Sequence, residues 1–68
     1  MNILTIIEQF INTYGIHPTR FGRNATGDPR LVLDMRMGRV VRPDTEAKIM
    51  SYIDEYKHHL INGWNQFE

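Results

Sequence analysis

The hydrophobic and polar positions at the start of the chain follow the period of an α-helix. Between residues 2 and 14, apolar side chains recur at spacings of three and four, which places them on one stripe: Ile3, Ile7, Phe10, Ile11 and Tyr14. Gly15 follows directly, where a left-handed glycine commonly ends a helix. Pro18 suits the first position of a second helix, which we expect to run to about Ala25 with Phe21 and Ala25 facing inward.

Residues 26–29 carry the signals of a turn followed by a new helix. Thr26-Gly27 predicts the turn, and Asp28-Pro29 predicts the restart, because aspartate accepts bonds from free N–H groups and proline fits the first helical position. We expect the third helix to run from Pro29 to Met37 and to stop at Gly38. Its inner face would be Leu31 or Val32 with Met35, and its outer face would hold the remaining positions: Arg30, Leu33, Asp34 and Met37.

The second half of the chain predicts a connection and one long helix. Residues 39–43 contain a proline and are expected to be extended, with both valines covering the core. A fourth helix should begin near Asp44 or Thr45 and end at Asn62-Gly63. Its apolar surface is wider than one stripe: Ala47, Ile49, Met50, Ile53, Tyr56, Leu60 and Ile61. The expected fold class is therefore all-α, a compact domain of four or five helices over residues 1–61 with a tail over 62–68.

Size and composition exclude several classes of protein. A chain of 68 residues makes one domain and buries only about 60% of its unfolded surface, so a partner would add stability. The absence of cysteine excludes disulfides and thiolate metal clusters. No apolar run approaches the roughly 20 residues of a membrane span, and Glu8 interrupts the apolar start. We expect a soluble protein in the cytoplasm of a bacterial host.

Charge is divided unevenly along the chain. All six arginines lie within residues 20–42, and since this segment contains only two aspartates, its net charge is +4. The other residues hold two lysines against six carboxylates, a net charge of −4. The formal total of zero therefore hides a strongly electropositive segment, and a polyanion responds to such a local field rather than to the total.

The electropositive segment coincides with a helix-turn-helix pattern over residues 18–37. Inward apolar or small residues occupy the positions that this motif requires: Phe21, Gly22, Ala25, Val32 and Met35. Gly22 stands where a small residue lets the two helices cross closely. Further matching pairs and triplets are Pro18-Thr19, Phe21-Gly22-Arg23, Gly27-Asp28-Pro29, Gly38-Arg39 and Arg42-Pro43.

On these residues the chain resembles the lambda-repressor-like helix-turn-helix family, which contains phage repressors and Cro proteins, and in particular its small prophage-type members. The resemblance covers about residues 4–60. One departure is the turn glycine, which is Gly27 here with Thr26 at the usual site, and a second is the lack of a fifth helix. The resemblance implies a sequence-specific regulator that binds double-stranded DNA.

An α-helix fits the major groove, where exposed side chains near its N-terminus read base edges and flanking cations grip phosphates. The predicted base readers are Pro29, Arg30, Leu33 and Asp34, with Arg30 the strongest candidate for a guanine. Asp34 either accepts from a cytosine or holds Arg30 through an i,i+4 ion pair.

The predicted phosphate contacts are Thr19, Arg20, Arg23, Arg36, Arg39 and Arg42. Two roles need qualification: Arg36 alternatively pairs with an acidic residue of helix four, and Asp28 is an N-cap rather than a reader.

The apolar end of the chain has two interpretations. Either Tyr52 and Tyr56 pack on the first helix while the tail closes the core, or this surface is a two-fold dimer contact formed by Tyr52, Tyr56, Leu60, Trp64 and Phe67. We favour the dimer, which would present two recognition helices about 34 Å apart to an inverted repeat.

The sequence favours a homodimeric repressor of a phage or mobile-element promoter, such as an autorepressor associated with anti-CRISPR or antitoxin genes. The alternative is a small protein-binding module or inhibitor that uses the apolar C-terminal surface. No nucleophile stands beside a base, so we expect no enzyme and no cofactor. His58 and His59 diverge on a helix and predict surface pairing rather than a metal site.

Overall fold

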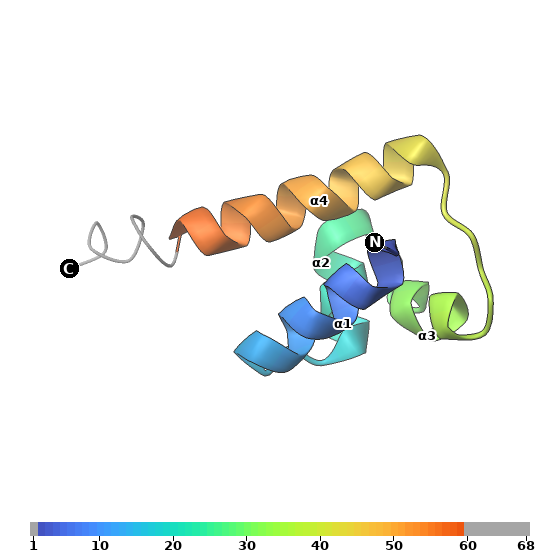
Figure 1. Cartoon of the computed structure of the whole chain (residues 1–68), viewed down its shortest axis with the longest axis horizontal. Helices are drawn as coiled ribbons and strands as arrows, with labels where there is room; N and C mark the ends of the chain where they lie inside the picture. Colours follow the sequence, from blue (N-terminus) through green and yellow to red (C-terminus); the bar gives the residue numbers. More distant parts are fainter. Residues whose placement is uncertain (1, 60–68) are drawn as a thin grey trace.

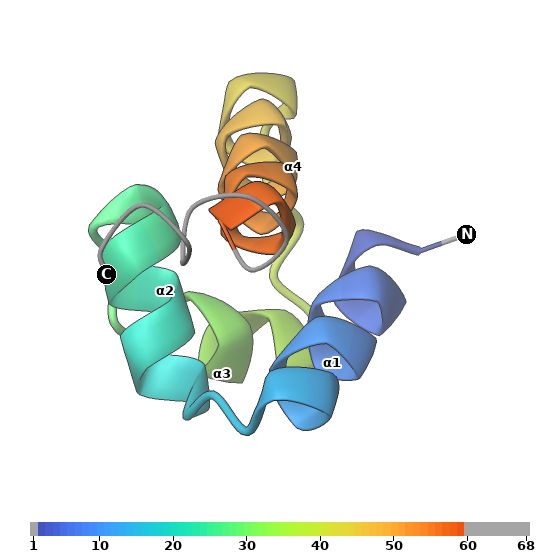
Figure 2. The same cartoon turned by 90° about the vertical axis from the view of Figure 1, so that its left-hand side faces the viewer.

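The structure is a computed structural model that describes residues 2–59, and these residues form four helices (Figure 1). In chain order they are α1 (Ile3–Tyr14), α2 (Pro18–Thr26), α3 (Leu31–Arg36) and α4 (Pro43–His58). No strand occurs among the described residues. Seen almost along its axis, α4 lies above α1 and α2, and α3 lies between these two at the base (Figure 2). The prediction of an all-α chain is thereby confirmed.

The boundaries of α1 and α2 follow from local capping. Asn2 Oδ1 accepts a hydrogen bond of 2.7 Å from the backbone N–H of Leu4, and Gly15 ends α1 in the left-handed region at φ 65°. His17 Nδ1 accepts from the N–H of Thr19 at 3.2 Å, and proline occupies the first turn of α2. Each cap uses neighbouring residues alone, and the predicted boundaries are confirmed to within a residue.

The third helix is shorter than predicted, and it begins at Leu31 rather than at Pro29. The N–H of Leu31 donates to the carbonyl of Asp28 at 3.1 Å, and Arg30 has φ −97° and ψ 4°, which is the geometry of the third residue of a type I turn. Proline fits the second position of that turn as well as it fits a helix start. Pro29 and Arg30 therefore form a turn, and α3 itself spans six residues.

A single apolar core joins all four helices. Its buried members are Ile7, Phe10, Ile11, Phe21, Leu31, Val32, Met35, Ile49 and Ile53. Both Leu31 and Val32 face inward, where one of the two was expected. Phe10 lies at the centre of an aromatic cluster, with ring centroids 5.7 Å from Phe21 and 5.1 Å from Tyr56. Edge-to-face packing of this kind adds to the stabilisation from burial and connects α4 to α1 and α2.

The connection between α3 and α4 differs from the prediction in one valine. Val41 packs partly against the core, but the side chain of Val40 is 89% exposed. Successive side chains of an extended segment point in opposite directions, so only one of two adjacent valines can face inward. The fourth helix begins at Pro43, one residue before the predicted start, because proline fits its first position. Its predicted end at Asn62-Gly63 lies outside the described residues.

Two predicted apolar positions of α4 are solvent-facing. Ala47 is exposed and Met50 keeps 41% of its surface accessible, whereas Ile49 and Ile53 are buried. The buried surface of α4 is therefore narrower than the sequence pattern indicates. None of the helices within residues 2–59 has the length and apolar character that crossing a membrane requires.

Candidate nucleic-acid interface

The helices α2 and α3 approach each other so closely at Gly22 that no side chain would fit there. Gly22 is buried on α2, and a Cβ built there would overlap the backbone carbonyl oxygen of Asp28 and lie 3.1 Å from the Cβ of Leu31. The turn between the helices depends on Gly27, which ends α2 at φ 83°. The prediction that Gly22 permits a close crossing is confirmed, and this contact fixes how α3 is displayed.

Three of the four predicted base-reading residues are exposed around α3. Arg30 has a side chain that is 73% exposed, Leu33 is 42% exposed and Pro29 is also exposed. Asp34 is half-buried. Because Leu31, Val32 and Met35 anchor the opposite side in the core, the outward side of this short helix is open to a partner.

Four charged side chains of alternating sign form a network across this outward side. Asp34 Oδ1 lies 3.6 Å from Arg30 Nε, which is the i,i+4 pairing that was one of its two predicted roles. Asp34 Oδ2 lies 3.4 Å from a guanidinium nitrogen of Arg39, and Asp28 Oδ2 accepts from the same nitrogen at 2.7 Å. Two arginines thus face two aspartates, and the charge of this cluster is balanced.

Asp28 has two bonding roles within the network. Its Oδ1 accepts from the backbone N–H of Arg30 at 3.0 Å, which closes an Asx turn, while its Oδ2 accepts from Arg39, eleven residues away. The predicted N-cap role of Asp28 is wrong, because α3 begins at Leu31 and its N-cap is Arg30, without a capping bond from a side chain. The hydrogen bond from Arg39 lowers the pKa of Asp28 below its ordinary value, and the bond from the Arg30 N–H lowers it further. The same contact raises the pKa of Arg39. Asp28 therefore ties the turn before α3 to the segment after it.

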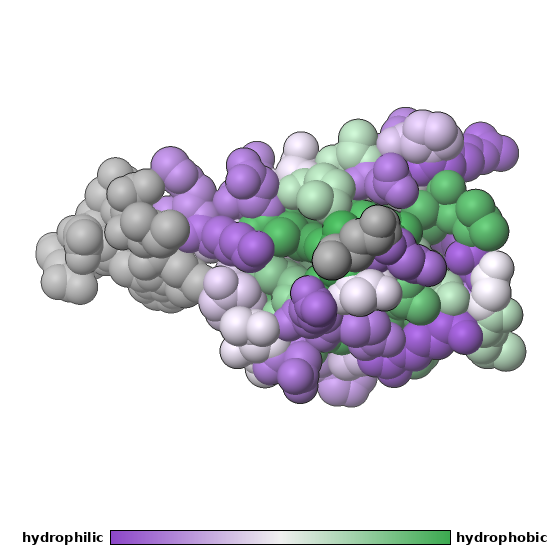
Figure 3. Space-filling model, in the orientation of Figure 1, coloured by the Kyte–Doolittle hydropathy of each residue, from purple (hydrophilic) through white to green (hydrophobic). Residues whose placement is uncertain are grey.

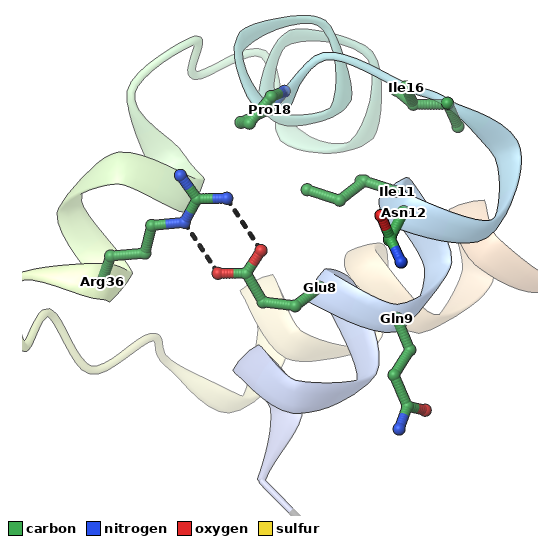
Figure 4. Close-up of a pocket in the computed structure, with 8 residues that line it drawn as sticks. Glu8, Gln9, Ile11, Asn12, Ile16, Pro18 and Arg36 are labelled. Atoms are coloured by element: carbon green, nitrogen blue, oxygen red, sulfur yellow. Dashed lines mark hydrogen bonds and ion pairs between the residues drawn. The ribbon is translucent and has the colours of Figure 1, made fainter.

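Arg36 is paired with α1 rather than with α4. Its Nε donates to Glu8 Oε2 at 2.7 Å and a terminal nitrogen donates to Glu8 Oε1 at 2.8 Å (Figure 4). The predicted pairing with an acidic residue of helix four is wrong, because α3 packs against α1 at this end. The pair lines a shallow surface hollow, with Ile11, Ile16 and Pro18 among its other walls.

The hydrogen bond from Arg36 lowers the pKa of Glu8. The pair therefore stabilises the fold at neutral pH, and this contribution disappears only as the pH falls through the lowered pKa of Glu8. A phosphate would have to displace a carboxylate that already accepts from two nitrogens on one edge of the guanidinium group. Of the six predicted phosphate contacts, Arg36 is consequently the one most committed to holding the fold together.

Three other arginines form no ion pair within residues 2–59. They are Arg20 and Arg23 on α2 and Arg42 before α4, and all three are exposed. Thr19 is half-buried, and its backbone N–H is used in the start of α2. The guanidinium groups available to a polyanion are therefore mainly those of Arg20, Arg23, Arg42 and the weakly paired Arg30.

No family model, curated protein or solved structure matches this chain. The resemblance to lambda-repressor-like proteins therefore stays a prediction, and the chain's own side chains supply the support for a function. For residues 2–59, no group of three or more His, Asp or Glu side chains is placed to hold a metal ion.

Tyr52 and Tyr56, the two predicted dimer residues that the structure describes, pack against other helices of the same chain. Tyr52 is half-buried with its ring 5.5 Å from that of Phe21, and Tyr56 lies 5.2 Å from Tyr14. The other three predicted dimer residues, Leu60, Trp64 and Phe67, lie outside the described residues. Apolar surface is nevertheless visible between α4 and the helices below it (Figure 3).

Sequence reasoning missed three features of this region. Glu8 was assigned no partner, since nothing local connects it to an arginine 28 residues later. The bond between Asp28 and Arg39 likewise depends on tertiary structure. The third feature is the exposure of Val40, which keeps 89% of its surface accessible although it was expected to cover the core. Met37, which is 84% exposed, was correctly assigned to the outer face of the third helix.

Proposed function

We propose that this chain is a sequence-specific regulator that binds double-stranded DNA through a helix-turn-helix of the lambda-repressor-like type. The observation that carries the proposal is the display of α3, whose inner side is locked in the core while Arg30 and Leu33 face outward. Gly22 and the turn at Gly27 hold this helix tightly on α2. A helix presented in this way fits the major groove and reads base edges.

The distribution of unpaired charge supports the same proposal. Arg20, Arg23 and Arg42 are exposed and form no ion pair within residues 2–59, so their charges are available to backbone phosphates. Such contacts supply affinity that is independent of sequence, whereas Arg30 supplies the preference for particular bases. Arg36 contributes by bracing α3 against α1, and we assign it no direct contact with DNA.

The regulator would act as a homodimer at a phage or mobile-element promoter and repress it by occupying the site. A chain of 68 residues has a small core, and a second copy would bury apolar surface at the predicted dimer contact, where Tyr52 and Tyr56 of α4 are half-buried. A two-fold dimer matches an inverted repeat with half-sites about 34 Å apart.

The test is the salt dependence of binding to duplexes selected from a random pool. If the three unpaired arginines each neutralise one phosphate, log K should fall against log[salt] with a slope of about −2.7 per subunit. The selected duplexes should contain an inverted repeat. Failure to enrich any sequence, or a slope near zero, would contradict the proposal and favour a protein-binding module that docks through apolar surface.

A further inference from the structure

The ionic network on the outward side of α3 contains an arginine that is occupied in the free protein. Arg39 has one guanidinium nitrogen 2.7 Å from Asp28 Oδ2 and 3.4 Å from Asp34 Oδ2. The side chains of Arg39 and Asp28 are 38% and 37% exposed, so a solvent-borne anion can reach this pair. A carboxylate and a phosphate oxygen bind a guanidinium group in the same way.

We infer that Asp28 competes with DNA for Arg39: while the carboxylate of Asp28 holds the guanidinium group of Arg39, that group does not neutralise a backbone phosphate. The inference rests on the proposed function and adds a residue that sets the strength of binding without touching DNA. Because phosphate contacts act on every sequence alike, masking one of them weakens binding to all duplexes. Asp28 thereby limits how tightly the chain is held on DNA that lacks its operator.

The geometry separates this role from the one that Asp28 has in the turn before α3. The turn uses Asp28 Oδ1, which accepts from the Arg30 N–H, whereas competition uses the other oxygen. Asparagine closes such a turn as aspartate does but carries no negative charge. The variant Asp28→Asn should therefore keep the turn before α3 and remove the shorter of the two ionic contacts to Arg39, leaving only the 3.4 Å contact with Asp34.

The experiment measures the affinity of full-length Asp28→Asn for a scrambled duplex over a series of salt concentrations. Release of one arginine should steepen the slope of log K against log[salt] by about 0.9, so if parent and variant have equal affinities at 1 M salt, the variant should bind about eight-fold more tightly at 0.1 M. The matched control is Asp44→Asn, which makes the same charge change at an exposed residue that forms no ion pair within residues 2–59. Equal effects of the two variants would show that net charge alone matters and would overturn the inference.

A double variant tests whether the gain acts through Arg39. In the Arg39→Ala background, Asp28→Asn should produce no gain beyond that of the Asp44→Asn control, because the arginine to be released is absent. Persistence of the full eight-fold gain would overturn the inference. If circular dichroism shows that Asp28→Asn is unfolded, Asp28→Ser places a second uncharged turn-forming residue at this position for the same measurement.

The result also separates this inference from the proposed function. If the parent chain binds no duplex in a salt-dependent way, the proposed function fails. If the parent binds with the expected slope but Asp28→Asn leaves that slope unchanged, only the competition by Asp28 is refuted.

Discussion

Replacing Arg30 with alanine is expected to remove most of the preference for the operator while leaving weak binding to any duplex. A bidentate contact between an arginine and a guanine contributes about 1–3 kcal/mol of discrimination, so operator affinity should fall about 5- to 150-fold. The side chain is 73% exposed and its nearest carboxylate is 3.6 Å away, so its removal should not unfold the chain. The measurement is the ratio of affinities for the operator and a scrambled duplex at fixed salt.

Arg23→Ala is the matched control for this prediction. It also removes one exposed arginine, but from α2, where the predicted contact is a phosphate. It should lower the affinity for both duplexes by a similar factor and leave their ratio unchanged. If Arg30→Ala keeps the parent's ratio, Arg30 is not the base reader.

Replacing Gly22 with alanine should lower the free energy of unfolding, although the substitution favours helix formation. In an exposed helix, alanine is more favourable than glycine by about 1 kcal/mol. At position 22 the added Cβ meets the carbonyl oxygen of Asp28, a backbone atom that cannot rotate away. Overpacking of this kind costs about 1–3 kcal/mol, so we expect a net loss of up to about 2 kcal/mol after the gain in helix propensity. Each kcal/mol corresponds to about 4–8 °C in Tm for a domain of this size.

The measurement is thermal unfolding followed by circular dichroism. Asn24→Ala serves as the control, since it improves helix propensity at an exposed position of the same helix. It should leave the Tm unchanged or raise it. A Gly22→Ala chain as stable as the control would mean that α2 and α3 do not cross as closely as described.

The elements that could be predicted from the sequence are those determined by neighbouring residues. The stripe of α1, its glycine stop and the proline start of α2 are local signals, and their caps involve contacts two to five residues apart. Val32 and Met35 of α3 could also be predicted to face inward, because they fit the helix-turn-helix pattern, but the burial of both Leu31 and Val32 could not. The roles of Phe21 and Gly22 followed from the helix-turn-helix pattern.

The remaining features depend on contacts between distant segments. Pro29 fits a turn and a helix start equally well, and only the bond between the Leu31 N–H and the Asp28 carbonyl shows which one forms. Arg36 and Arg39 look alike in the sequence as cations of one basic segment. Their partners, Glu8 and Asp28, are determined by how α3 is oriented against α1 and the turn.

The ion pairs of Arg36 and Arg39 alter which arginines of the candidate site are available to DNA. The sequence predicts an electropositive segment over residues 20–42. Within residues 2–59, the structure shows balanced charge around α3 and arginines without ion pairs on α2 and before α4. Phosphate attraction and base reading are therefore assigned to different residues. Arg30 is neither firmly paired nor without a partner, because its contact with Asp34 is long and its side chain is largely exposed.

The most direct test of the central claim is a map of the DNA contact on the chain itself. An isotope-labelled sample would be titrated with a selected duplex while the backbone amide resonances are followed by NMR. We expect the largest shifts in residues 18–23 and 29–42, which include the outward side of α3 and the arginines that have no ion pair within residues 2–59. Shifts confined to residues 43–59, or none at all in α3, would contradict this expectation.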